Sequence, residues 1–386
     1  MFSDRVNVDI KILLALFFGY FSFSMFRLSL GVAIPNIILE MKINEFQAGV
    51  LYSIPLWSTA LLLTPAGWLA DRFGRKKLLS LGYFFLAIGV LFFGCSLHYS
   101  LSAISLIISG LGSGMLIPSY YSLMGDMLKR IRGLGVGLAV TSYQIGGLVG
   151  SYLVGSLAAA NKWRTAFIIM GVLQLFMLMI QLIIVPSSSS KSSKGTQKPF
   201  FDMLKIRNVV VSSIGMLTGS IGLFAANAWL PSFLILRGCN QADSGLILGL
   251  YFIAGALSSP VLGGLSERIG RKKATFYSSI IAAVIAAIIF LTNPSLVILI
   301  AGLIILGIFI APYWSLLTTI AQESVPEENA SAATGVVQTL GLWGCAIGPV
   351  ISGALIPIFG INYALLSSIT LPCTLCALIT LLLNHY

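Results

Sequence analysis

Arg27 is the residue whose position most clearly suggests chemistry, because it lies midway along an otherwise apolar run. No aspartate or glutamate occurs at a comparable depth in the apolar runs of the chain. An arginine inside a bilayer is costly and is expected to face a wet cavity or an anionic partner. Its guanidinium can hold a carboxylate or a phosphate through two parallel hydrogen bonds. The alternative is a structural arginine that bonds to carbonyls or reaches back to the membrane interface.

Other polar residues could share a cavity with Arg27. Tyr20 and Ser24 lie on the same helix face by the three-to-four spacing, so we expect them to line the same space. Further candidate binding residues are the polar and aromatic side chains of other apolar runs, namely Gln144, Asn227, Tyr313, Trp314 and Gln338. A role in helix packing explains these residues equally well, because neighbouring helices can also satisfy a polar group inside a span.

A charged motif occurs twice, each time between two apolar runs. Residues 67–77 read G-W-L-A-D-R-F-G-R-K-K, and residues 263–273, about half the chain length later, read G-G-L-S-E-R-I-G-R-K-K. Such a repeat indicates two related halves. The glycines permit a tight turn, and the acids can pair with nearby guanidinium groups. The residues of interest are Gly67, Asp71, Arg72, Gly74 and Arg75 in the first copy, Gly263, Glu267, Arg268, Gly270 and Arg271 in the second, and Asp126 as a nearby acid.

The composition places these motifs in a membrane protein. Hydrophobic residues make up 57% of the 386 residues and charged residues only 9%, whereas about a quarter of the residues in soluble domains are charged. A helix needs roughly 20 apolar residues to cross the hydrocarbon. We therefore predict an all-α membrane protein with twelve spans, near 12–38, 46–70, 78–97, 101–126, 133–158, 164–185, 208–234, 243–265, 274–292, 295–321, 330–357 and 361–383.

A polar segment divides the spans into two sets of six. Residues 186–198 are rich in serine and lysine, which is typical of a flexible linker, and residues 200–207 are expected to form a short surface helix. We predict an N-terminal six-helix bundle (1–185), a linker (186–207) and a C-terminal six-helix bundle (208–386). Eighteen basic residues fall on the side of the linker and four on the other, so the linker and both termini are predicted to be cytoplasmic.

Several classes of function do not fit this sequence. The net charge of +11 comes from short loops between spans, which favours contact with an anionic inner leaflet over nucleic-acid binding. The five cysteines have no disulfide or metal spacing and are expected in the core. The first apolar run is too long for a signal peptide and is expected to be retained. The chain lacks H-E-x-x-H and G-x-S-x-G motifs, so we expect no enzyme activity, metal or cofactor.

The two six-span halves, the central linker and the charged motif between spans two and three resemble the major facilitator superfamily. The resemblance covers nearly the whole chain. It implies twelve transmembrane helices in two pseudo-symmetric bundles, placed in the cell membrane and working as a monomer. It also implies that the charged motifs form cytoplasmic contacts, which hold the outward-open state and break when the halves rock.

A finer resemblance surrounds Arg27. Residues 26–35, F-R-L-S-L-G-V-A-I-P, are similar to the first span of anion:cation symporters and of organophosphate:phosphate antiporters. Residues 229–231 and 312–316 also resemble the symporters, and Gln144 lies where that group often carries a substrate-contacting glutamine. This resemblance implies transport of a small organic anion, a carboxylate or an organophosphate, by symport with a proton or by exchange for a counter-anion. The alternatives are an exporter of drugs or amphipathic metabolites by proton antiport, and a non-transporting sensor on the same scaffold.

Overall fold

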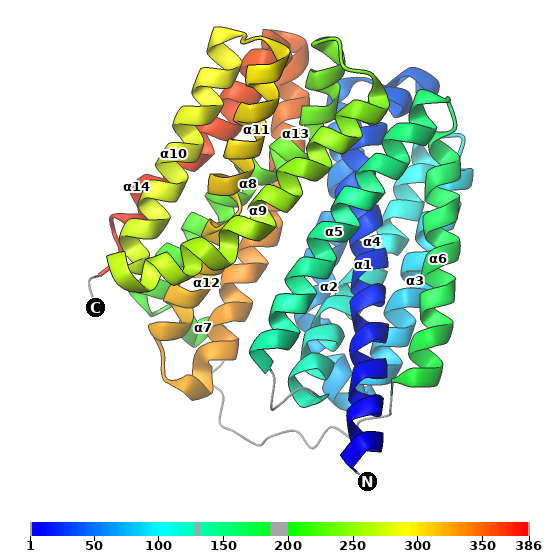
Figure 1. Cartoon of the computed structure of the whole chain (residues 1–386), viewed down its shortest axis with the longest axis vertical. Helices are drawn as coiled ribbons and strands as arrows, with labels where there is room; N and C mark the ends of the chain where they lie inside the picture. The colour runs from blue at the N-terminus through cyan, green and yellow to red at the C-terminus, as the bar shows by residue number, and fades with distance from the viewer. Residues whose placement is uncertain (1, 128–131, 186–199, 385–386) are drawn as a thin grey trace. The chain divides into compact units, whose positions relative to one another are not determined.

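The computed structural model describes residues 2–127, 132–185 and 200–384, and these residues form helices joined by short turns, with no strand among them (Figure 1). The helices are α1 (Phe2–Met41), α2 (Glu45–Phe73), α3 (Arg75–Cys95), α4 (Tyr99–Met127), α5 (Arg132–Ala159), α6 (Trp163–Ile184), α7 (Phe200–Met203), α8 (Arg207–Leu236), α9 (Gln241–Ile269), α10 (Arg271–Thr292), α11 (Leu296–Ile310), α12 (Tyr313–Glu323), α13 (Ala330–Leu365) and α14 (Leu371–Thr380). A 3₁₀ turn (Glu327–Asn329) precedes α13, and a π-helical segment (Leu366–Thr370) joins α13 to α14.

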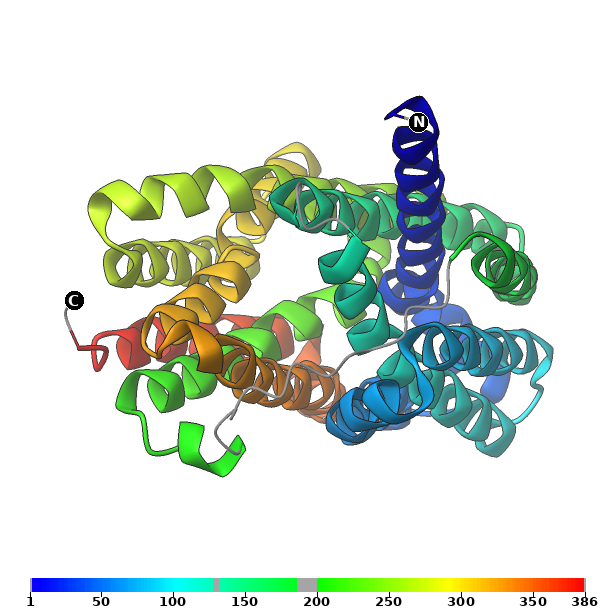
Figure 2. The same cartoon turned by 90° about the horizontal axis from the view of Figure 1, so that it is seen from below.

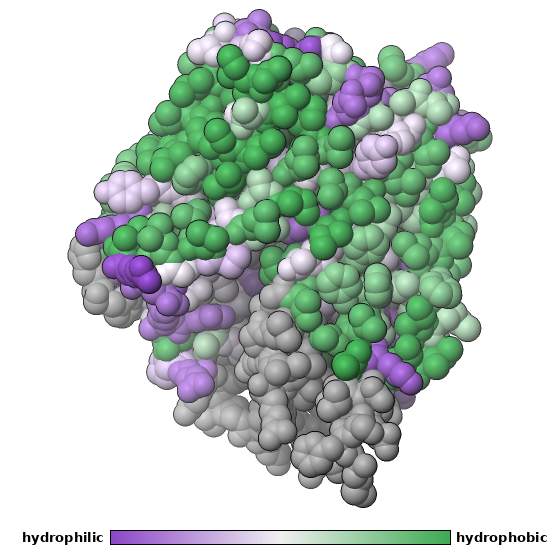
Figure 3. Space-filling model, in the orientation of Figure 1, coloured by the Kyte–Doolittle hydropathy of each residue, from purple (hydrophilic) through white to green (hydrophobic). Residues whose placement is uncertain are grey.

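The helices account for twelve membrane spans, as predicted. Among the described residues, ten helical segments are long and apolar enough to cross a bilayer. One of these, Ala330–Thr380, has 51 residues and at about 1.5 Å per residue is more than twice as long as the hydrocarbon is thick. Gly360, with a φ of 78°, breaks it into two spans, and α5 completes the set. Hydrophobic side chains cover most of the visible helix surface, and hydrophilic ones gather near helix ends (Figure 3).

The helix bounds differ most from the sequence-based prediction in three places. α1 begins at Phe2 rather than near residue 12, because the helix continues through the charged residues that precede the apolar run. The tenth span consists of α11 and α12, since Pro312 lacks the N–H that would continue the helix. The predicted surface helix over 200–207 is reduced to α7. Most of the predicted linker, residues 186–199, lies outside the described residues.

Contacts divide the chain into two compact units. Unit 1 comprises Met1–Ile43, Ile54–Ser193 and Asn240–Gly249, and unit 2 comprises Asn44–Ser53, Lys194–Cys239 and Leu250–Tyr386. In unit 1, α1 packs along α5 and α6, and α3 packs against α4 and α6. In unit 2, α8 packs against α13 and α14, and α10 packs against α11 and α14 (Figure 2). The start of α2 therefore packs within unit 2, and the start of α9 within unit 1.

Polar contacts with α6 fix the rotation of α1 and therefore the direction of its side chains. Gln181 donates a hydrogen bond of 2.7 Å from its Nε2 to the carbonyl oxygen of Ala15. The indole N–H of Trp163 donates to a carboxylate oxygen of Glu40, also at 2.7 Å. Both Trp163 and Gln181 are buried, where an unmade hydrogen bond would be costly. These contacts hold α1, the helix that carries Arg27, at two levels along its length.

Glycines allow helix backbones to touch in a contact that we call the α5–α9 seam, which lies in unit 1. A Cβ added to Gly155 would lie 2.6 Å from the carbonyl oxygen of Gln241 and 3.3 Å from the Cα of Gly245. A Cβ added to Gly245 would overlap the carbonyl oxygen of Ser151. Any side chain larger than hydrogen would therefore push α5 and α9 apart.

Unit 2 contains a matching contact, the α2–α13 seam. A Cβ added to Gly49 would overlap the carbonyl oxygen of Pro349 and lie 3.3 Å from the Cα of Val350. One added to Gly353 would lie 2.5 Å from the carbonyl oxygen of Glu45. Gly49 in α2 occupies the position in the first half of the sequence that Gly245 in α9 occupies in the second. The internal repeat is therefore visible in the packing as well as in the sequence.

The cysteines are mostly core residues, as expected. Cys239, Cys345, Cys373 and Cys376 are buried free thiols. Cys95 is the correction, since it ends α3 and is exposed. The last residue of a helix can point its side chain outward whatever its polarity, which the sequence alone did not indicate.

Candidate functional site

Arg27 lies midway along the membrane-spanning part of α1, and its side chain is half-buried. Its guanidinium carbon lies 5.7 Å from the centre of the Phe23 ring, a distance that allows a cation–π contact. Within the described part of the chain, no hydrogen bond or ion pair reaches Arg27. A guanidinium has five N–H donors, so Arg27 is a cation whose donors are free for water or for an anion.

A group of aromatic rings, here called the tyrosine cluster, lies beside Arg27 on three helices of unit 1. Its members are Tyr20 on α1, Tyr120 and Tyr121 on α4 and Tyr143 on α5. The Tyr20 ring stacks on Tyr120 with centroids 4.3 Å apart, and its hydroxyl is 3.4 Å from that of Tyr121. The ring centroid of Tyr143 lies 5.5 Å from that of Tyr20. Phe23 connects the cluster to Arg27, since its ring centre is 5.4 Å from that of Tyr20.

The other predicted residues of unit 1 differ in how they are placed. Ser24 is fully buried, its hydroxyl donates to the carbonyl oxygen of Phe21 at 2.8 Å, and it packs against Gly146 of α5. Its hydrogen-bonding capacity is therefore used within the helix pair. Gln144 is half-buried on α5, one residue after the cluster member Tyr143.

Unit 2 holds the remaining predicted binding residues. Asn227 on α8 is buried, and its side-chain oxygen has no hydrogen-bond partner among the described residues. Tyr313 begins α12 and donates from its hydroxyl to Ser220 of α8 at 3.2 Å. Trp314 packs against Gly341 of α13, and Gln338 is half-buried on the same helix. The break at Pro312 thus directs two aromatic side chains toward α8 and α13.

Both copies of the charged motif turn at a glycine. Gly74 precedes α3 with a φ of 92°, and Gly270 precedes α10 with a φ of 93°. This region of backbone space favours glycine, so the turn explains why glycine stands at both positions. The near-identical angles show that the two copies share one backbone conformation.

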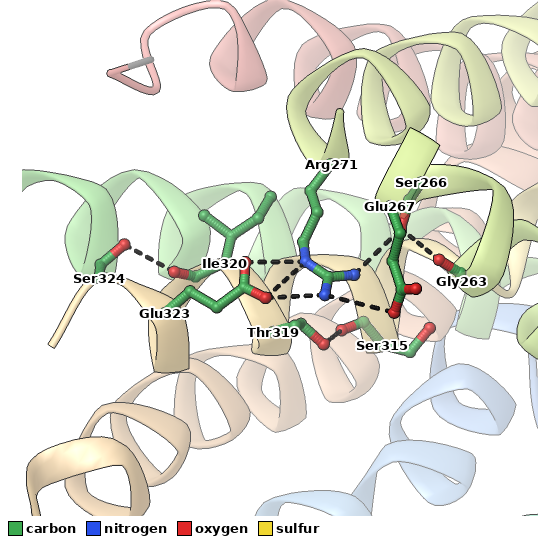
Figure 4. Close-up of polar contacts among 9 residues, drawn as sticks. All are labelled: Gly263, Ser266, Glu267, Arg271, Ser315, Thr319, Ile320, Glu323 and Ser324. Carbon is green, nitrogen blue, oxygen red and sulfur yellow. Dashed lines mark hydrogen bonds and ion pairs between the residues drawn. The ribbon is translucent and has the colours of Figure 1, made fainter. Parts of the chain in front are cut away.

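In the second copy, Arg271 is the centre of a group of ion pairs (Figure 4). Its Nε lies 2.8 Å from each carboxylate oxygen of Glu323 at the end of α12. A terminal nitrogen lies 2.7 Å from Glu323 and 3.9 Å from Glu267, and the other donates to Ser266. Arg271 thus ties α10 to α9 and α12. Gly263 contributes only its carbonyl oxygen, which accepts from Ser266, and Arg268 is exposed.

Glu323 was not among the residues that the sequence singled out. The signal that could have found it is the repeat, because Arg271 is followed by Glu323 at nearly the spacing that separates Arg75 from Asp126 in the first half. In the first copy, Arg72 lies over the Phe73 ring at 5.8 Å. The side chains of Asp71 and Asp126, and the surroundings of Gly67, lie outside the described residues.

The corresponding lysines of the two motifs cap the last helix of each half. Lys76 donates from its Nζ to the carbonyl oxygen of Leu182 in the last turn of α6, at 2.8 Å. Lys272 donates to the carbonyl oxygens of Leu381 and Leu383 just after α14, at 2.8 and 2.7 Å. The final carbonyls of a helix lack partners within the helix and carry partial negative charge. The motif therefore also fastens α3 to α6, and α10 to the end of α14.

Removing these caps should loosen the helix ends. We expect Lys76→Met and Lys272→Met to lower the thermal midpoint of the purified protein by about one degree each, since a cation at a helix C-terminus contributes about 0.3–1 kcal/mol. A thermal-shift assay in detergent measures this change. Lys77→Met is the matched control, because Lys77 is exposed and should be neutral. Equal shifts for Lys76→Met and Lys77→Met would contradict the capping role.

The ion pair between Arg271 and Glu323 should be visible in a double-mutant cycle. We expect Arg271→Gln and Glu323→Gln each to slow transport about three- to tenfold, and the double variant to be no slower than the worse single one, because paired groups are not additive. Initial transport rates give the readout, and Lys273→Gln serves as the control on an exposed neighbour. Additive losses would show that the two side chains act independently.

Twelve spanning helices in two related halves, with a free guanidinium at mid-depth and a charged turn in each half, define a membrane transport protein. The described residues contain no group of three or more histidine, cysteine, aspartate or glutamate side chains that could hold a metal ion. The chain belongs to the Major Facilitator Superfamily, whose family model matches residues 16–249 and 238–385. It is therefore a multi-pass membrane transporter and not an enzyme.

Known proteins with similar sequences or structures are also transporters. The chain is 25% identical over 388 residues to the 4-hydroxybenzoate transporter PcaK of Acinetobacter baylyi, covering 85% of this chain and 80% of that protein. It is 22% identical over 388 residues to the hexuronate transporter of Bacillus subtilis, covering 92% of this chain and 89% of that one. A bacterial homologue of the human lysosomal transporter Spinster, in an inward-facing and unoccupied conformation, superposes with a TM-score of 0.79 at 17% identity, covering 98% and 95% of the two chains.

Proposed function

We propose that this protein carries a small organic carboxylate across the cytoplasmic membrane by alternating access. The observation that carries the proposal is Arg27, a half-buried guanidinium at mid-span with no hydrogen bond or ion pair to the described residues. Because an unpaired charge inside a membrane is costly, such an arginine is best explained by an anion that binds and leaves. A bidentate pair with a carboxylate satisfies two of its donors.

The relatives support an acid as the substrate. The names of the two curated relatives above denote 4-hydroxybenzoate and a hexuronate, which differ in ring chemistry but each carry one carboxylate. The carboxylate is therefore the feature that one kind of binding residue could recognise in both substrates. Arg27 provides the matching charge in this chain.

We propose substrate-related roles for the remaining predicted residues of each unit taken by itself. In unit 1, Tyr20 and Gln144 would contact the body of the substrate, whereas Ser24 would act through packing because its hydroxyl is already bonded. In unit 2, the candidates for substrate contact are Asn227, Tyr313, Trp314 and Gln338. Asn227 is the strongest of these, since its buried side-chain oxygen lacks a partner among the described residues.

The charged motifs are proposed to form cytoplasmic latches that hold the outward-open state. Arg271 with Glu267 and Glu323 is the described example, and Arg75 with Asp71 and Asp126 is proposed to be its equivalent. The excess of basic residues on the linker side supports cytoplasmic termini. Coupling is proposed to be proton symport or exchange for another anion. The sequence has no carboxylate at the depth of Arg27 to carry a coupling proton, and a substrate held by Arg27 is itself ionised, so exchange is the mode that needs no further titratable group.

Counterflow in proteoliposomes tests this function. Vesicles containing the purified protein are loaded with one unlabelled compound at a time, and uptake of the labelled compound is followed with and without a pH gradient. We expect counterflow with one or more monocarboxylates or sugar acids and none with neutral analogues. Counterflow with organophosphates alone would move the substrate class to phosphates, and counterflow with only neutral or cationic compounds would refute an anion transporter.

A further inference from the structure

Two glutamines of α6 form hydrogen bonds to α1 at points two helical turns apart. Gln181 donates from its Nε2 to the carbonyl oxygen of Ala15 at 2.7 Å, and Gln174 accepts at its Oε1 from the hydroxyl of Ser22 at 3.2 Å. Ala15 and Ser22 are seven residues apart, as are Gln174 and Gln181, so each pair lies on one helix face and spans about 10 Å. We call these two contacts the glutamine ladder.

The backbone of α1 lies in close contact with its neighbours on two faces. Between the bonds of the ladder, a Cβ added to Gly19 would overlap the hydroxyl of Tyr83 on α3 and lie 2.7 Å from the Nε2 of Gln181. On another face, a Cβ added to Gly150 of α5 would lie 2.7 Å from the Cα of Met25. The helix therefore has little freedom to turn about its axis while the ladder holds.

Arg27 lies on the face of α1 that these contacts leave uncovered. A helix turns by about 100° per residue, so Arg27 points about 140° away from Ser22 and about 160° away from Met25. A rotation of α1 by about 20° would move a group that lies about 6 Å from the helix axis by about 2 Å. Binding groups have to be held within about 0.5 Å of their productive position. The rotation of α1 is therefore a condition for binding through Arg27.

Stability alone does not explain two amides in this position. Both glutamine side chains are fully buried, and each leaves one polar atom without a partner among the described residues, the Nε2 of Gln174 and the Oε1 of Gln181. The net gain from a buried hydrogen bond is no larger than the cost of a buried polar atom that has no partner. An apolar side chain of similar volume would stabilise the helix pair as well. The amides differ from such a side chain in being directional.

We propose that Gln174 and Gln181 are positioning residues for Arg27, whose bonds to α1 select the rotation of that helix at which the guanidinium meets the substrate. This inference rests on the proposed function, because Arg27 must hold the carboxylate. Hydrogen bonds between membrane helices fix one arrangement, whereas apolar side chains can pack in several. Both glutamines act through α1 and need no contact with the substrate.

Methionine at both positions tests this role, because it fills a similar volume without an amide. Benzoate and its neutral isostere benzamide compete for counterflow by the intact protein in proteoliposomes. We expect Gln174→Met combined with Gln181→Met to weaken competition by benzoate about tenfold, the value of one hydrogen bond to a charged group. Competition by benzamide and the thermal midpoint should stay at the wild-type level. Each single variant should lose part of the acid preference, so the test does not depend on the double variant.

Two further variants separate positioning from general loosening of the bundle. In an Arg27→Gln background, the methionine substitutions should change the competition by neither probe, because the group that they position is absent. Thr59→Val is the matched control, since the buried Thr59 of α2 donates to the carbonyl oxygen of Gly110 on α4 at 3.1 Å and does not hold α1. This variant should keep the wild-type preference for the acid.

The outcomes distinguish this inference from the proposed function. A wild-type acid preference that survives in the methionine variants would overturn the positioning role and leave the anion transporter standing. An equal loss of preference in Thr59→Val, or an unchanged effect of the methionine substitutions in the Arg27→Gln background, would also overturn it. A wild-type protein without any preference for the acid would overturn both proposals.

Discussion

Arg27→Ala is expected to lower transport of the organic acid by about 100-fold or more. Each hydrogen bond to a charged group contributes about 1.5–3 kcal/mol, so loss of a bidentate pair corresponds to roughly two orders of magnitude or more in affinity. Arg27→Lys should restore little, because an ammonium is a point charge without the planar fork that matches a carboxylate. Initial uptake rates over a range of substrate concentrations, normalised to protein in the membrane, give the measurement.

Thermal stability separates a binding role for Arg27 from a structural one. No described residue forms a hydrogen bond or ion pair with its guanidinium, so truncation removes a costly charge and loses only the contact with the Phe23 ring. We therefore expect the thermal midpoint of Arg27→Ala to be unchanged or higher. A lower midpoint together with normal uptake would show that Arg27 stabilises the helix bundle and does not hold the substrate.

Gly49→Leu combined with Gly245→Leu is expected to abolish transport, because the two substitutions would force open the α2–α13 and α5–α9 seams. A single added Cβ already overlaps a backbone carbonyl at each position, and backbone cannot move aside as a flexible side chain can. Alternating access requires helix contacts to form and break in each cycle, and a state with closed seams could no longer form. Proteoliposome counterflow should fall to the level of empty vesicles.

A glycine in open space provides the control for the seams. An added Cβ at Gly335 of α13 would meet nothing within 4 Å. Alanine is favoured over glycine in a helix by about 0.8–1 kcal/mol, so Gly335→Ala should be neutral or stabilising. Gly49→Ala and Gly245→Ala should instead be destabilising despite the same gain in helix propensity. Equal behaviour of the three alanine variants in thermal-shift and uptake assays would show that the seams tolerate separation.

Much of the fold was predictable because a bilayer imposes simple rules. The lengths of the apolar runs predicted the twelve spans, and the repeated charged motif predicted the two related halves. The deviations have local causes that hydropathy does not report. Pro312 splits one span into α11 and α12 because it lacks an N–H, and α1 runs past its apolar segment because helical hydrogen bonding does not stop where polarity changes.

The candidate site was only partly predictable. Arg27 is conspicuous in sequence because a charge in an apolar run is rare, whereas Tyr120, Tyr121 and Tyr143 look like ordinary packing residues until α4 and α5 bring them beside Tyr20. Pairing between distant side chains, such as that of Arg271 with Glu323, also depends on the folded arrangement. The functional roles of all these residues remain predictions.

The most direct test of the central proposal is whether the protein distinguishes an acid from its neutral isostere through Arg27. Benzoate and benzamide have nearly the same shape, but only benzoate carries a charge that a guanidinium can pair with. Competition in counterflow by wild-type protein should show strong inhibition by the acid and little by the amide, and Arg27→Gln should lose most of this difference. Equal competition by acid and amide in the wild-type protein, or a difference that survives in Arg27→Gln, would contradict the proposal that Arg27 holds the substrate's carboxylate.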